Sequence, residues 1–131
     1  MNSMTKSSWF AFLIVLSFLL ASCGSSDNYG YPYKVTFGKE GGTKICSGTS
    51  TCYTVEITDY NGNGESASID VTKGENDSVV TTYQWLTVTH KPSSGPYLKI
   101  TAQPNHTGKK RKLYVSGMVD DSFAEIKVVQ N

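Results

Sequence analysis

The strongest constraint on the fold lies beyond residue 30, where short runs of alternating β-branched and aromatic residues occur without helical periodicity. Successive residues of a strand point to opposite faces of a sheet, so such a run indicates a strand with one buried face. Clusters of Gly, Asn, Pro and Ser separate the runs, as turns require. We predict an all-β sandwich of about seven or eight short strands. The expected strands span residues 34–37, 43–46, 53–58, 67–71, 83–89, 97–102, 112–116 and 124–129.

Side-chain parity within these strands separates an inward set from an outward set. The outward set includes four aromatic residues, Tyr83, Trp85, Tyr97 and Tyr114. Flat aromatic rings can pack against the apolar face of a sugar, so we predict these four as candidate glycan-binding residues. For Trp85 a second interpretation stays open and is favoured, in which the indole turns inward and packs in the core. The predicted core consists of Leu86, Val88, Leu98, Ile100, Leu113, Val115, Ile126 and Val128.

The N-terminal segment has the order of a signal peptide, with Lys6 before an apolar run over residues 9–20 and small residues after it. The run is shorter than the roughly 20 apolar residues that cross a bilayer, so we expect cleavage rather than a membrane span. The junction Leu20-Ala21-Ser22-Cys23 resembles the bacterial lipobox, in which the cysteine is acylated and becomes the new N-terminus. The sequence therefore predicts a signal peptide over residues 1–22 and lipidation of Cys23.

Acyl chains on Cys23 make a membrane the first expected partner, because multiple chains hold a protein stably at a bilayer surface. We expect a membrane-anchored lipoprotein of the cell envelope, with the outer membrane as its location. Residues 23–30 are small and polar, as in a flexible tether, and residues 31–131 form the predicted domain.

Charge and residue spacing argue against several classes of function. The chain has 12 basic and 11 acidic residues, and Lys6 is lost with the leader, so the processed chain is balanced. This balance gives no reason to expect a nucleic-acid partner. His90 and His106 are the only histidines, and neither has a serine or cysteine at a spacing typical of a nucleophile. We expect no catalytic residues, no cofactor and no resident metal.

With Cys23 acylated, Cys46 and Cys52 remain as an even pair in an oxidising compartment. The five residues between them are turn-like and lie between two predicted strands. We predict a disulfide between Cys46 and Cys52 that closes a β-hairpin.

Four segments of the C-terminal half carry a resemblance to a known family: Trp85-Leu86-Thr87-Val88, Leu98-Lys99-Ile100, the turn from Asn105 to Arg111, and the final strand from Ala124 to Gln130. In order and spacing they resemble the BACON domain, the Bacteroidetes-associated carbohydrate-binding often N-terminal domain. The resemblance covers residues 80–131 well and residues 34–79 thinly. It implies an immunoglobulin-like sandwich and carbohydrate binding, to host or dietary glycans. We interpret Asn105 and Arg111 as structural residues of the turn.

Two other functions stay open at this stage. The first is a non-catalytic structural or protein-interaction subunit of an envelope complex, which would dock through a sheet face or edge. The second is a calcium site, since Asp59, Asn61, Asn63 and Asp70 nearly follow a calcium-loop pattern. The same Asn-Gly repeat also suits a hairpin loop, which we favour.

Overall fold

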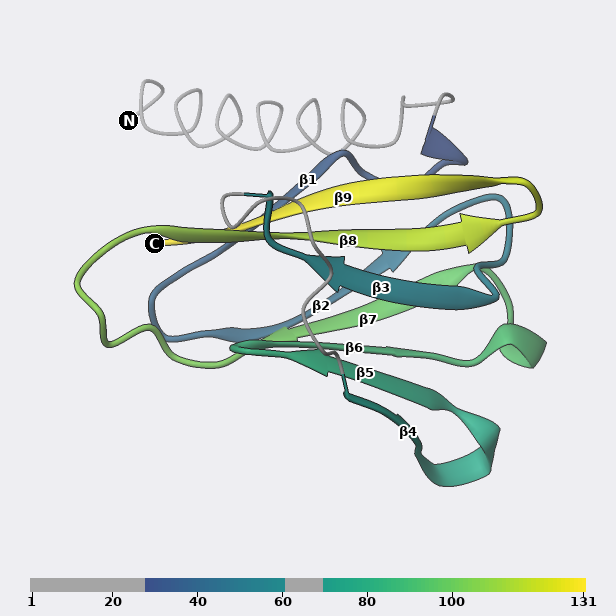
Figure 1. Ribbon diagram of the computed structural model, residues 1–131, viewed down its shortest axis with the longest axis horizontal. Helices are drawn as coiled ribbons and strands as arrows, with labels where there is room; N and C mark the ends of the chain where they lie inside the picture. The colour runs from purple at the N-terminus through teal and green to yellow at the C-terminus, as the bar shows by residue number, and fades with distance from the viewer. Residues whose placement is uncertain (1–27, 61–69) are drawn as a thin grey trace, which may run out of the picture.

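The computed structural model describes residues 28–60 and 70–131, which form two β-sheets packed face to face (Figure 1). The four-stranded sheet has the order β1-β9-β8-β3, and the five-stranded sheet has the order β2-β7-β6-β5-β4. The predicted all-β sandwich is confirmed. The strands are β1 (Lys34–Phe37), β2 (Gly42–Ser47), β3 (Thr54–Thr58), β4 (Asp70–Lys73), β5 (Val79–Tyr83), β6 (Leu86–His90), β7 (Tyr97–Ala102), β8 (Arg111–Val119) and β9 (Ser122–Gln130).

Short connections and one parallel pairing arrange these strands. The strands β8 and β9 form a long hairpin at the centre of the four-stranded sheet, while β1 pairs with β9 in parallel and β3 pairs with β8. Two 3-10 turns, η3 (Glu75–Asp77) and η4 (Pro92–Ser94), join strands of the other sheet. Within the described residues, no helix is long and apolar enough to cross a membrane.

The strand predicted over residues 83–89 contains most of β6, but its first three residues are the end of β5 and a hairpin turn. The strands β5 and β6 pair from Tyr83 opposite Leu86, which leaves Gln84 and Trp85 as a two-residue turn. Gln84 has a φ of 53°, and a positive φ at the first central position is what tight hairpin turns of this length require. The missed strand β5 lacks the alternation of a half-buried strand, because Val79 and Val80 are both partly exposed.

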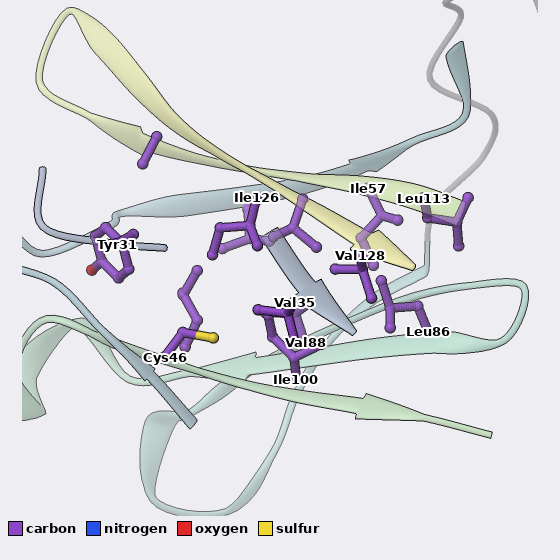
Figure 2. Close-up of a cluster of buried hydrophobic side chains, with 14 of the residues drawn as sticks. Tyr31, Val35, Cys46, Ile57, Leu86, Val88, Ile100, Leu113, Ile126 and Val128 are labelled. Carbon is purple, nitrogen blue, oxygen red and sulfur yellow. The ribbon is translucent and has the colours of Figure 1, made fainter. Parts of the chain in front are cut away.

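All eight predicted core residues are buried, none more than 1% exposed. Figure 2 shows several of them meeting between the two sheets, with Tyr31 and Cys46 at one end of the layer. Burying one such aliphatic side chain contributes about 1.5–3 kcal/mol, so this layer is the main source of stability. The core also takes in Tyr31, Phe37 and Ile57.

The domain begins earlier than the predicted residue 31. Asn28 is buried, and its amide Nδ2 donates to the Glu125 carbonyl at 2.9 Å while its Oδ1 accepts from the Glu125 backbone N–H at 3.0 Å. These two bonds attach residue 28 to β9. Residues 28–30, which the predicted tether includes, therefore belong to the folded part of the chain.

The predicted disulfide is not formed, because Cys46 and Cys52 are both free and buried. The hairpin prediction is also wrong: β2 pairs with β7 in one sheet and β3 pairs with β8 in the other. The segment between the two cysteines crosses from sheet to sheet. There the Cys52 thiol packs on Gly117 of β8, and burial raises the pKa of Cys46 to about 11.

Candidate functional site

The four aromatic residues predicted to bind glycan do not come together. Tyr83 and Tyr97 belong to the five-stranded sheet, at the end of β5 and the start of β7. Tyr83 pairs with Leu86, which in turn pairs with Ala102 at the far end of β7 from Tyr97. The two tyrosines therefore lie toward opposite ends of β6 and β7. Five residue steps along β7, or about 17 Å, separate Tyr97 from the row that contains Tyr83. Tyr114 lies on β8 in the other sheet, so no single aromatic platform exists.

Trp85 is packed into the fold and is only 7% exposed. The Arg111 guanidinium lies 4.6 Å from the centre of the indole ring and covers it. The parity argument failed here because Trp85 occupies the hairpin turn, where strand alternation does not apply. The Trp85 indole therefore points inward, as the favoured interpretation predicted, and it offers no ring face to a sugar.

Arg111 and Gln130 connect this indole to two separate backbone segments, at residue 38 and at residues 103–104. Arg111 donates from Nε to Gln130 Oε1 at 2.8 Å and from Nη2 to the Pro104 carbonyl at 3.2 Å. The Gln130 amide Nε2 donates to the carbonyls of Gln103, at 2.7 Å, and Gly38, at 3.1 Å. Gln130 is fully buried, so these bonds satisfy its amide nitrogen inside the protein.

The predicted structural role of Asn105 is also confirmed. Its Nδ2 donates to the carbonyls of Lys109, at 2.7 Å, and Asn131, at 3.0 Å. Its Oδ1 accepts from the backbone N–H and the hydroxyl of Thr107. We call the connected set Trp85, Gln103, Asn105, Arg111 and Gln130 the tryptophan corner. The polar side chains of Asn105, Arg111 and Gln130 hold backbone in place, and Gln103 takes part through its backbone carbonyl.

The open site lies on the outer face of the four-stranded sheet. Strand pairing places Thr54 beside Met118 and Phe123 in one row across β3, β8 and β9, and places Glu56 beside Ser116 and Glu125 in the next. A hollow of about 320 Å³ opens over these rows. We call it the groove. Its lining residues are Thr54, Glu56, Thr58, Tyr60, Ser116, Met118 and Phe123.

Tyr60 lines one side of the groove and packs against a second tyrosine, Tyr114. The rings of Tyr60 and Tyr114 lie 4.5 Å apart between centroids with a tilt of 45°. The Tyr60 hydroxyl donates to Glu125 Oε2 at 2.8 Å, and this bond raises the pKa of Tyr60. Tyr60 therefore has a fixed orientation although it is 44% exposed. Phe123 at 54% and Met118 at 48% expose apolar surface on the opposite side.

This arrangement suits a ligand with one apolar face and several hydroxyl groups. Exposed aromatic rings can cover the apolar face, while the carboxylates of Glu56 and Glu125 accept hydrogen bonds from hydroxyls. Of the four predicted glycan-binding residues, only Tyr114 touches the groove region, and it does so through Tyr60. Tyr60, Phe123 and Met118 were missed. Their signal was outward parity continued past the predicted strand ends, by two residues for Tyr60 after β3 and Met118 on β8, and by one residue for Phe123 on β9.

The remaining predictions concern metals and histidines. Among the described residues, no group of three His, Cys, Asp or Glu side chains is placed to hold a metal ion. Asn61 and Asn63 of the calcium-like pattern lie outside the described residues. His90 is buried with Nε2 3.3 Å from the Tyr53 carbonyl oxygen, and His106 is exposed in the turn after β7.

Comparison with known proteins adds little to this picture. No family model and no curated protein matches the chain. Among solved structures, the NMR structure of a protein from Bacteroides thetaiotaomicron is similar, with a TM-score of 0.48 and 17% sequence identity, covering 76% of this chain and 75% of that one. A likeness of that size carries no argument about function.

Proposed function

We propose that this protein is a lipid-anchored, non-catalytic protein of the cell envelope that binds carbohydrate in the groove. The observation that carries the proposal is the groove itself, whose lining combines three exposed apolar side chains with the Glu56 carboxylate and Ser116, beside the Glu125 carboxylate that holds Tyr60. Side chains that stabilise a fold are normally buried or bonded to one another. Here Tyr60, Met118 and Phe123 expose apolar surface that the fold does not use.

Two sequence features support the remaining parts of the proposal. The C-terminal half resembles the BACON domain, a family associated with carbohydrate binding. The Leu20-Ala21-Ser22-Cys23 junction resembles a lipobox, which would place the domain at a membrane surface. With Asn28 fixed to β9, five residue steps separate Cys23 from the folded domain, which bounds the distance between them at about 18 Å.

A glycan array tests the binding proposal. The chain from Gly24 onward contains both sheets and the whole core, and we expect it to bind a subset of printed host or plant glycans. Replacement of Phe123 by Ala should weaken that binding at least tenfold, as expected for an aromatic ring that packs on the ligand. An array with no bound glycan would contradict the proposal.

A labelling experiment tests the anchor. Full-length protein expressed in its native type of host with labelled palmitate should carry the label and sediment with membranes. The Cys23→Ser variant should carry none and appear in the soluble envelope fraction. Label retained by Cys23→Ser would contradict lipidation at this residue.

A second function has one observation in its favour. Met118 and Phe123 lie side by side on the β8–β9 hairpin, and paired exposed apolar residues are also typical of protein interfaces. If the array is blank and cross-linking through position 123 recovers one envelope protein, the structural or protein-interaction subunit would be the better account.

A further inference from the structure

Acidic side chains lie in the groove, beside it and at one of its ends, on one sheet face. Glu56 is exposed in the groove lining, and Glu125 lies across β8 from it with Ser116 between. Asp120 and Asp121 are exposed in the turn of the β8–β9 hairpin, just beyond Met118 and Phe123. The groove therefore opens into a region of negative charge.

The basic residues of this face are grouped away from the hollow. Lys127 is the cross-strand neighbour of Tyr114, and Lys34 follows it on β1, one strand further from the groove. Lys112 pairs with Val129, two residues along β8 from Tyr114 and further from Ser116. None of these three lysines lines the groove. A ligand lying over Ser116 and Phe123 would meet the carboxylates first.

The carboxylates can act as acceptors for a ligand. A carboxylate has about four acceptor positions on two oxygens and no proton to donate. Glu125 uses Oε2 for the Tyr60 hydroxyl, which holds it over the sheet and leaves Oε1 available. Two acceptors at opposite sides of Ser116 fit the hydroxyl donors of a sugar ring. An acidic sugar would instead bring like charges together, which costs binding free energy.

We propose that the groove selects a pyranose that carries no carboxylate, sulfate or phosphate, and that Glu56 is a specificity-determining residue. The inference rests on the proposed carbohydrate function and adds the substrate class to it. Neutral hexoses, N-acetylhexosamines and amino sugars fall within the class. Uronic acids, sialic acids and sulfated sugars fall outside it.

The test uses printed glycans in matched pairs: hexosides with the corresponding hexuronosides, and N-acetylhexosaminides with their 6-O-sulfates. We expect the chain from Gly24 onward to bind the neutral member about tenfold more tightly. In Glu56→Gln the preference should fall to about twofold, because an exposed like-charge contact changes affinity by up to about fivefold. The variant keeps a hydrogen-bond acceptor, so its affinity for the neutral member should change by less than about threefold.

The matched control is Glu40→Gln, which removes one exposed carboxylate from the turn before β2 and lies outside the groove. It should leave the tenfold preference intact. Equal or tighter binding of the acidic members by wild type would overturn the charge selection while the carbohydrate function stands. An unchanged preference in Glu56→Gln would overturn the role of Glu56. Absence of binding to both members of every pair would overturn the function and the inference together.

Discussion

The tryptophan corner and the groove differ in how their side chains are used. In the corner, Arg111 and Gln130 direct their polar groups at backbone carbonyls and at each other, and Trp85 is covered. In the groove, Tyr60 is 44% exposed although its hydroxyl bonds Glu125, and Phe123 is more than half exposed. The corner holds the most distinctive sequence motif of the chain, whereas the groove has no recognisable motif.

This difference shows that a distinctive motif can mark a structural requirement rather than a binding site. A turn that must place an indole, a guanidinium and two amides in fixed positions tolerates few residue types. A binding surface on a regular sheet needs only outward side chains of suitable chemistry, so its residues look ordinary in sequence. Three predictions follow for the two regions, beginning with the largest effect.

Replacement of Trp85 by Ala should destabilise the protein by about 3–5 kcal/mol, because it removes a large buried side chain and the surface on which Arg111 rests. Urea denaturation followed by circular dichroism measures the change. The milder Trp85→Phe should cost less and leave glycan binding within about twofold of wild type. Loss of glycan binding by a fully folded Trp85→Phe protein would place the tryptophan corner in the binding site and contradict its purely structural role.

Acidification should weaken the fold through His90, whose Nε2 lies 3.3 Å from the carbonyl oxygen of Tyr53, the residue before β3. Burial lowers the pKa of His90 below its ordinary value of 6.5, and Nδ1 has no hydrogen-bond partner. The unfolded chain therefore binds a proton at His90 more readily than the folded protein does. The stability that this difference contributes is complete above pH 6.5 and declines as the pH falls through the folded-state pKa. Melting temperatures between pH 7.5 and 5 should show this decline.

The control for this effect uses the other histidine. His90→Gln should reduce the dependence of the melting temperature on pH, whereas His106→Gln, at an exposed position, should leave it unchanged. Equal slopes for wild type and His90→Gln would contradict the assignment.

The smallest expected effect is a gain in stability at the turn that carries Trp85. Gln84 has a positive φ of 53°, a conformation that glycine adopts without strain. Gln84→Gly should stabilise the protein by about 0.5–1 kcal/mol, since the relief of strain exceeds the added chain entropy. Thermal unfolding would detect the change, and a loss of stability would show that the Gln84 side chain supports the turn.

Much of the fold could be predicted from alternation alone. The bounds of β1 and β7 match the predicted strands, and each predicted core residue is buried, because parity within a strand is a local property. Pairing is not local. The cysteines were placed in a hairpin because the segment between them is short, but β2 and β3 find partners in β7 and β8, far along the chain.

The candidate site depended on the same non-local information. Parity placed Tyr114 correctly on an outward face, but its neighbour Tyr60 follows the edge strand β3, and only the β3–β8 register brings the two rings together. The outward prediction for Trp85 was wrong for a different reason, since this residue lies in the turn that precedes β6 rather than in the strand. Outward aromatics can be predicted from sequence, whereas their grouping into a site requires the order of strands in the sheets.

The most direct test of the groove compares two exposed tyrosines. Tyr60 is 44% exposed in the groove, and Tyr53 is 59% exposed outside it. Binding of the glycan identified on the array should fall at least tenfold in Tyr60→Ala and change by less than about twofold in Tyr53→Ala, measured by calorimetry on folded proteins. Equal affinities for Tyr60→Ala and wild type would contradict the placement of the binding site in the groove.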